Sequence, residues 1–168
     1  MPAPSPGVVD CLWSATPQSF RQSLDPAVDA DHFDHLLDAW TPRDEQLAAL
    51  ADRCHLASAS ADQPAYQLAA LAIISKARST WAKGRLATVY KVTPGRLEDS
   101  WRQLSPDDRS LLGHFMMSLD PNLMDKAHAS LVTFVGTLQA ADPDEVAAAT
   151  AYLYGRALTE TLDTGSGK

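Results

Sequence analysis

The stretch from Thr93 to Asp108, TPGRLEDSWRQLSPDD, decides the fold because it contains two helix starts of the same kind. Thr93-Pro94 and Ser105-Pro106 each place a hydroxyl side chain directly before a proline. The hydroxyl oxygen can accept a hydrogen bond from an amide of the first helical turn. Proline suits the first helical position, where its missing N–H is not needed. Two short helices are therefore predicted to begin near residues 94 and 106.

The same pattern, an N-cap residue followed by proline, recurs along most of the chain. The eight prolines after Pro6 follow Thr16, Asp25, Thr41, Gln63, Thr93, Ser105, Asp120 and Asp142, and all but Gln63 are good N-cap residues. Helices are therefore predicted to begin near residues 17, 26, 42, 64, 94, 106, 121 and 143. Gly84 is expected to end the helix that begins at Pro64, because glycine readily takes the left-handed conformation after a helix. A short helix from Arg85 to Lys91 would follow.

Composition supports an all-α protein. Alanine occurs 27 times and leucine 21 times, whereas isoleucine and valine together occur only ten times. Alanine and leucine lose little on entering a helix, and β-branched residues favour sheets. We predict one compact domain of about seven or eight short helices in an irregular orthogonal bundle. Its expected bounds are residues 17–162, between a disordered N-terminal tail at 1–16 and a flexible C-terminal tail at 163–168.

The sequence also predicts the cellular location of the protein and the redox state of its cysteines. Met1 to Gly7 holds three prolines and no positive side chain, unlike the start of a signal peptide. The longest apolar run, Ala69 to Ile74, is far shorter than the roughly 20 residues that span a bilayer. We therefore expect a cytoplasmic protein that does not enter membranes. Cys11 and Cys54 are too few for a disulfide framework, so two reduced thiols are expected.

The net charge of −7 is unevenly distributed along the chain. Residues 1–62 have a balance of −7, residues 63–119 of +4 and residues 120–168 of −4. Six positive side chains lie between residues 76 and 96 with no acid among them: Lys76, Arg78, Lys83, Arg85, Lys91 and Arg96. We predict that any anionic partner binds this basic block. The alternatives are a solvated helix face, or pairing with the acidic N-terminal segment of the same chain.

The segment at residues 85–104 resembles the helix-turn-helix of bacterial DNA-binding regulators. Ala87 stands at the small position where the helices cross, Val92 at the buried turn position and Leu97 at the core position of the second helix. The resemblance implies that Arg96, Arg102 and Gln103 would face base edges or phosphates. Lys91 stands where the turn usually has glycine, and Glu98 and Asp99 would repel phosphates.

Histidines and carboxylates suggest a metal site only at first sight. Helical spacing places Phe33, Leu36, Leu37 and Trp40 on one buried face and His35 on the opposite face with Asp31, Asp34 and Asp38. We therefore expect His35 to be solvent-exposed without a structural metal. His114 lies in the apolar run Leu111 to Met117 and is expected in the core. No catalytic, metal-binding or cofactor-binding residues are assigned.

The function expected from these patterns is that of a non-enzymatic cytosolic regulator or adaptor that binds a macromolecular partner. A protein partner is expected, and its contact surface is assigned to the middle block: Lys76, Arg78, Lys83, Arg85, Lys91, Arg96, Arg102 and Gln103. The alternative is a helix-turn-helix transcriptional regulator that binds DNA through residues 85–104. An enzyme with an unrecognised helical active site is the third possibility.

Overall fold

The computed structural model describes residues 7–165, and within that range the chain forms nine α-helices and no strand. The predicted all-α fold is confirmed. The helices are α1 (Val8–Ala15), α2 (Gln18–Ser23), α3 (Ala30–Asp38), α4 (Asp44–Arg53), α5 (Ala65–Thr88), α6 (Pro94–Gln103), α7 (Pro106–Ser118), α8 (Pro121–Leu138) and α9 (Pro143–Gly165). Of these described helices, none is both long enough and apolar enough to cross a membrane.

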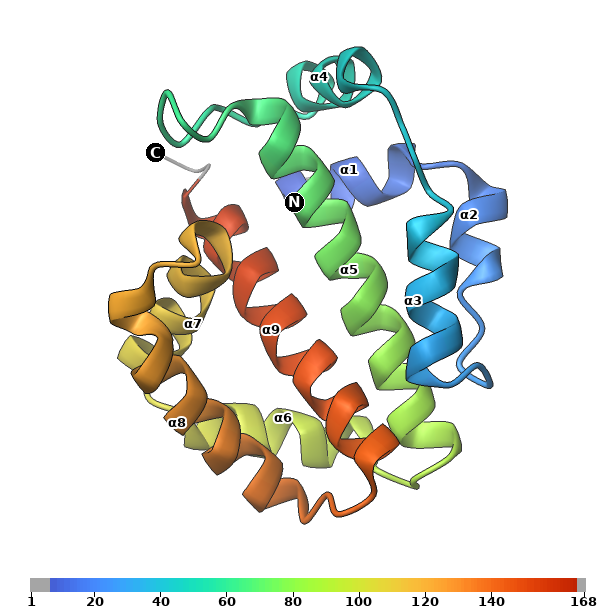
Figure 1. The fold of residues 1–168 in the computed structure, drawn as a ribbon, viewed down its shortest axis with the longest axis vertical. Coiled ribbons are helices and arrows are strands. Elements are labelled where there is room, and N and C mark those ends of the chain that lie inside the picture. The colour runs from blue at the N-terminus through green and yellow to red at the C-terminus, as the bar shows by residue number, and fades with distance from the viewer. Residues whose placement is uncertain (1–6, 166–168) are drawn as a thin grey trace, which may run out of the picture.

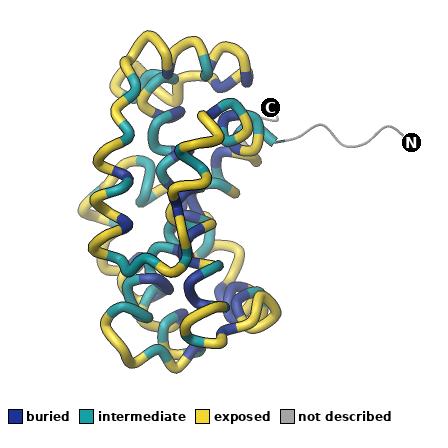
Figure 2. Tube along the Cα trace, turned by 90° about the vertical axis from the view of Figure 1, so that its right-hand side faces the viewer, coloured by how far each residue is buried: buried dark blue, intermediate teal, exposed yellow. Residues whose placement is uncertain are grey.

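The two longest helices, α5 and α9, pack against each other and form the centre of the bundle (Figure 1). They approach closely at Gly155, where an added Cβ would lie 2.6 Å from the backbone oxygen of Ser75. Helices α1 and α4 pack against α5, whereas α7 and α8 pack against α9 and α6 packs against α8. Exposed positions run along the outer edges of the trace in Figure 2.

Two clusters of buried side chains fill the bundle. One contains Trp81, Trp101 and Phe134, and the other contains Leu12 and Leu158. The rings of Phe33 and Trp81 stack with centroids 4.4 Å apart, which joins α3 to α5. The buried face predicted for residues 33–40 is thus confirmed.

Four of the predicted helix caps are confirmed. The side chains of Thr93, Ser105 and Asp120 accept hydrogen bonds from amides of α6, α7 and α8, each with proline in the first helical turn. The carboxylate of Asp142 accepts from the amides of Asp144 (2.9 Å) and Glu145 (3.3 Å) at the start of α9.

Pro17, Pro42 and Pro64 lie just before helices rather than inside them. Pro17 and Pro64 are themselves the N-cap residues of α2 and α5, and Pro42 precedes Arg43, the N-cap of α4. The helix predicted at Pro26 is wrong. Residues 26–28 form a turn, and α3 begins at Ala30 because Asp29 caps it through the amide of His32.

The predicted break at Gly84 is also wrong, because α5 continues from Ala65 to Thr88 without interruption. The separate short helix expected from Arg85 to Lys91 therefore does not exist. Gly84 allows close packing and does not end the helix. A Cβ added there would lie 2.7 Å from Cγ of Pro26, so glycine leaves room for the turn between α2 and α3.

The expected tails are shorter than predicted. Residues Val8–Ala15 of the expected N-terminal tail form α1, whose Val9 and Leu12 are buried. Residues 163–165 of the expected C-terminal tail belong to α9. The amide of Val9 donates to the carboxylate of Asp163 (3.1 Å), which joins the two ends of the described chain. Residues 1–6 and 166–168 lie outside the described part.

The expectation of two reduced thiols is wrong in this structure. Cys11 of α1 and Cys54, which follows α4, form a disulfide with Cα atoms 5.7 Å apart. The disulfide joins two helices that also pack against α5. Sequence spacing gave no sign of it, since 43 positions separate the two cysteines.

The cap at the start of α9 gives a direct stability test. Replacing Asp142 with alanine should lower the free energy of unfolding by about 1 kcal/mol, because two first-turn amides lose their acceptor. Urea unfolding followed by circular dichroism measures the change. Asp125→Ala on the exposed side of α8 is the control, with an expected change within about 0.5 kcal/mol. Equal effects of the two substitutions would contradict the cap.

Candidate functional site

The six positive side chains of the basic block do not form one surface. Lys76 and Lys83 lie seven residues apart on one face of α5, and Arg78 and Arg85 lie on another. Lys76 is 3.5 Å from Asp10 of α1, and Arg78 is 3.9 Å from Asp34 of α3. Both contacts are with the acidic N-terminal segment, as the intramolecular alternative predicts. These pairs are largely exposed, so each contributes little stability.

Arg85 is not available to an external anion, which corrects its assignment to the contact surface. The residue is only 8% exposed. Its Nε donates to Oδ2 of Asp144 (2.7 Å), and its Nη1 donates to the backbone oxygens of Pro26 (3.1 Å) and Ala27 (3.0 Å). Arg85 therefore holds the turn between α2 and α3 and the start of α9 against α5.

Asp144 is the shared acceptor of this network. Its carboxylate also accepts from the amide of Ala30 (3.0 Å) and from the hydroxyl of Tyr90 (2.5 Å). Burial alone would raise the pKa of Asp144, but the hydrogen bonds from Tyr90 and Arg85 outweigh it and hold the pKa below its usual value. Burial and the neighbouring Asp144 carboxylate raise the pKa of the Tyr90 hydroxyl. The charge of Arg85 is thus paired with that of Asp144, and the network links three parts of the fold.

The segment resembling a helix-turn-helix has part of the expected geometry. Lys91 takes the left-handed conformation, with a φ of 59°, at the turn position that usually has glycine. Val92 and Leu97 are buried, and Thr93 caps α6. The first helix is the end of α5 rather than a separate element, and Ala87 is half-buried.

The second helix of that segment presents balanced charge. Arg102 pairs with Glu98 within α6 (3.4 Å), and Glu98 also accepts from Arg156 of α9 (2.6 Å). The hydrogen bond from Arg156 lowers the pKa of Glu98, so this carboxylate stays charged. Arg96 donates to the backbone oxygen of Leu138 (3.1 Å), and Gln103 is exposed. Two of the three predicted contact side chains are thus held by intramolecular partners.

The histidines lie at the surface. His35 is exposed, as predicted, and its Nδ1 hydrogen-bonds to the backbone oxygen of Asp31 (2.7 Å). Among residues 7–165, no three His, Cys, Asp or Glu side chains are placed to hold a metal ion. His114 is exposed rather than buried in the core, which corrects its expected place. Its position on α7 turns it away from the buried Leu112 and Gly113.

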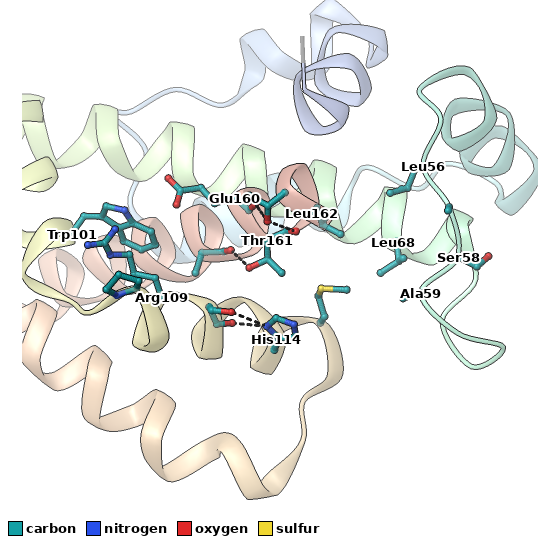
Figure 3. A pocket seen from close by; sticks show the side chains of 16 residues that line it. Leu56, Ser58, Ala59, Leu68, Trp101, Arg109, His114, Glu160, Thr161 and Leu162 are labelled. Atoms are coloured by element: carbon teal, nitrogen blue, oxygen red, sulfur yellow. Dashed lines mark hydrogen bonds between the residues drawn. The ribbon is translucent and has the colours of Figure 1, made fainter. Parts of the chain in front are cut away.

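His114 lines a groove over the seam between α7 and α9, which has a volume of about 610 Å³. Figure 3 shows it extending from Trp101 and Arg109 at one end to Leu56 and Leu68 at the other. The two helices approach closely below it, because a Cβ on Gly113 would lie 2.7 Å from the backbone oxygen of Ala157. The stretch of α9 along the groove, residues 157–164, is about 10 Å long.

The loop between α4 and α5 forms one wall of this groove through residues 56–59. Leu56 is buried in the core, and the amide of Ala65 donates to Oγ of Ser58 (3.1 Å). Nε2 of Gln63 donates to the backbone oxygen of Met117 (2.5 Å), which ties the loop to the end of α7. The wall therefore has fixed attachments at both of its ends.

Polar side chains along the groove are mostly occupied by local hydrogen bonds. Nδ1 of His114 donates to the backbone oxygen of Ser110 (2.7 Å), and the hydroxyl of Thr161 donates to that of Ala157 (2.8 Å). Nε of Arg109 donates to the backbone oxygen of Leu104 (3.0 Å). Apolar side chains supply much of the remaining lining: Leu56, Leu68, Met117 and Leu162. The groove thus offers a ligand mainly apolar contacts.

A cation–aromatic stack closes the other end of the groove. The guanidinium carbons of Arg156 and Arg109 lie 4.5 and 5.6 Å from the ring centroid of Trp101. Glu98 and Glu160 accept hydrogen bonds from Arg156 and hold it in place. Trp101 is itself buried, so the stack is a rigid end wall and not a free aromatic platform.

Comparison with known proteins adds no assignment to this geometry. No protein-family model, curated protein or solved structure matches the chain.

Sequence reasoning missed the groove because its residues come from four separate parts of the chain. Residues 56–59, 68, 101–117 and 157–164 meet only when α7 packs on α9. The sequence does contain one sign of that packing. Gly113 stands in the middle of an apolar helix, where glycine costs about 1 kcal/mol unless a close approach requires it.

The Arg85 network predicts which basic residue supports the fold. Arg85→Gln should lower the free energy of unfolding by about 3 kcal/mol, because it leaves the half-buried Asp144 without its charged partner. Lys83→Gln, two positions earlier on an exposed face, should change it by less than about 0.5 kcal/mol. Thermal and urea unfolding measure both. Equal stability of the two variants would refute the role given to Arg85.

The lowered pKa of Asp144 predicts that the free energy of unfolding depends on pH. Its pKa is lower in the folded chain, so the stability it contributes is complete above the usual pKa of about 4 and is lost as the pH falls through the lowered value. Asp144→Asn should therefore flatten the fall in unfolding free energy between about pH 5 and pH 2. Asp125→Asn is the control and should keep the wild-type slope. An unchanged slope in Asp144→Asn would contradict the network.

Proposed function

We propose that this protein is a non-enzymatic adaptor that binds a protein partner through the groove between α7 and α9. The observation that carries the proposal is the groove itself, with its mainly apolar lining and locally bonded polar groups. The groove residues between 101 and 117 lie within the middle part of the sequence, residues 63–119, but none of the eight side chains assigned as contacts lines the groove. The apolar floor of the groove therefore replaces those side chains as the proposed contact surface.

The shape of the groove favours a short helical segment as the bound element. Its open, elongated form follows about two turns of α9 and is bordered by α7 and the loop at residues 56–59. An amphipathic helix binds such a groove with apolar side chains spaced three or four residues apart. Leu68, Met117 and Leu162 would contact those side chains, while Arg109, His114 and Glu160 would border them.

The alternative function is a DNA-binding regulator that uses residues 85–104. The left-handed Lys91 and the buried Val92 favour it. The pairing of Arg102 with Glu98 weakens it, because a phosphate would have to displace an internal partner. The protein-binding proposal is therefore preferred. The cytoplasmic location stays a prediction, and the Cys11–Cys54 disulfide is more typical of an oxidising compartment.

The groove can be tested with one pair of variants. Wild-type protein should select peptides with apolar residues at helical spacing from a displayed random-peptide library. Ser110 lies on the exposed edge of the groove. The Ser110→Arg variant should bind the selected peptides with at least about tenfold lower affinity, because the longer side chain blocks entry to the groove. Ser19→Arg on exposed α2 makes the same chemical change elsewhere and should bind like wild type.

Two results would contradict the proposal. One is that both arginine variants bind the selected peptides as wild type does. The other is capture from host lysate that disappears after nuclease treatment and falls steeply with salt, which would favour the DNA-binding alternative.

A further inference from the structure

A pocket separate from the groove lies over the seam between α5 and α9, with a volume of about 310 Å³. Its lining comes from residues 75–81 of α5 and residues 147–155 of α9, and α3 and Met116 of α7 complete its border. Figure 1 shows α5 and α9 running side by side along this seam. The groove uses residues 157–164 of α9, so the two sites share no lining residue. The pocket has the size of a small-molecule site.

The two ends of this pocket differ in chemistry because α5 and α9 run antiparallel. Ser75 lies against Gly155, and Arg85, further along α5, bonds to Asp144 near the start of α9. Ser75 and Tyr154 therefore form one end, which carries hydroxyl groups. The other end, about 9 Å further along α5, is apolar and is formed by Ala30, Phe33, Trp81 and Ala147.

The hydroxyl of Ser75 is a buried polar group that the fold leaves unpaired. Ser75 is 4% exposed, and within residues 7–165 its hydroxyl makes no hydrogen bond. The hydroxyls of Ser79 and Thr150, by contrast, donate to backbone oxygens of their own helices (3.2 and 2.8 Å). In the described chain Nε of Arg21 is the fully enclosed side-chain polar atom without a partner, so the Ser75 hydroxyl still reaches open space. The pocket that Ser75 lines is that space, and a ligand acceptor there would satisfy the hydroxyl.

Arg78 and Tyr154 add donors near Ser75. Arg78 lies three residues after Ser75 and therefore on the same side of α5. Its Nη2 is 3.9 Å from Asp34, which is longer than a hydrogen bond, so its donors remain available. The Tyr154 hydroxyl also makes no hydrogen bond within the described chain, and burial raises its pKa, so it stays protonated. Three such donors match the oxygens of a carboxylate.

Asp34 supplies the one negative charge among the residues that line the pocket. Because it lies beside Arg78, it would repel a ligand that carries only a carboxylate. A ligand with an ammonium group next to its carboxylate would instead find an opposite charge for each group. Free α-amino acids carry both groups on one carbon, and their zero net charge avoids repulsion by the acidic chain.

We propose that this pocket binds a free α-amino acid with an apolar side chain. Its carboxylate accepts hydrogen bonds from Arg78 and from the hydroxyls of Ser75 and Tyr154, and its ammonium group pairs with Asp34. Its side chain extends toward Trp81 at the apolar end. The ligand is a small molecule and its site does not depend on the peptide groove.

Titration followed by NMR, with three probes that share one phenyl ring, tests the class of ligand. L-Phenylalanine should bind wild-type protein with a Kd of about 1 mM or lower, as expected for so small a ligand. 3-Phenylpropionate lacks the ammonium group and 2-phenylethylamine lacks the carboxylate, so each should bind at least about tenfold more weakly. The proposal is overturned if neither L-phenylalanine nor L-leucine binds at about 10 mM. It is also overturned if 3-phenylpropionate binds as tightly as L-phenylalanine.

Two charge variants assign the two ends of the amino acid. Arg78→Gln should weaken L-phenylalanine at least about tenfold, because the carboxylate loses its charged partner. Asp34→Asn should weaken L-phenylalanine similarly, yet 3-phenylpropionate should bind it at least as tightly as it binds wild type, because a repulsion is removed. Lys83→Gln removes a positive charge from an exposed position of the same helix and should bind like wild type. Equal affinity of Arg78→Gln and Lys83→Gln for L-phenylalanine would refute the site.

The buried hydroxyl gives a test that folding does not confuse. Ser75→Ala should melt no earlier than wild type, because the hydroxyl has no partner within the described chain. The variant should nevertheless bind L-phenylalanine at least about threefold more weakly, since one donor to the carboxylate is lost. Ser79→Ala, on the same helix but outside the pocket lining, is the control and should bind like wild type. Wild-type affinity in Ser75→Ala would overturn the placement of the carboxylate at the hydroxyl end.

Discussion

The close packing of α5 on α9 is the constraint on which the rest of the structure depends. Gly155 allows the two backbones to approach at Ser75, and Arg85 joins the same two helices by its bond to Asp144. Helices α1, α3, α4, α7 and α8 each contact at least one member of this pair, and α6 contacts α8. The turn between α2 and α3 lies over Gly84 and is held by Arg85, so a single arginine links three parts of the chain.

This arrangement changes which surfaces can serve a partner. Positive charge in the middle of the sequence suggested an anion-binding face, yet the fold uses much of that charge internally. Arg85 is buried, Arg102 pairs with Glu98, and Arg96 binds a backbone oxygen of α8. Lys83 stays exposed, but the proposed contact surface is the groove over α7 and α9, which offers mainly apolar contacts.

Glycine positions show how local preference and packing compete. The four described residues with positive φ are His55, Lys91, Leu119 and Gln139, whereas the described glycines all lie outside that conformation. Glycine was expected to end α5 at residue 84, because a helix end needs a residue that tolerates the left-handed conformation. In this protein the need for close helix contact outweighs that preference. Leu119 and Gln139, rather than glycines, take the left-handed conformation at the ends of α7 and α8.

The sequence by itself determined the helical class and the starts of α6 to α9, because an N-cap followed by proline acts through hydrogen bonds within one turn. It also determined the buried face of α3, since helical periodicity sorts apolar from charged side chains locally. Only the tertiary structure decided the continuation of α5 past Gly84, the Cys11–Cys54 disulfide and the burial of Arg85. It also assembled the groove from four distant segments. Those features depend on which surfaces meet across long sequence separations, and no local pattern of residues specifies that.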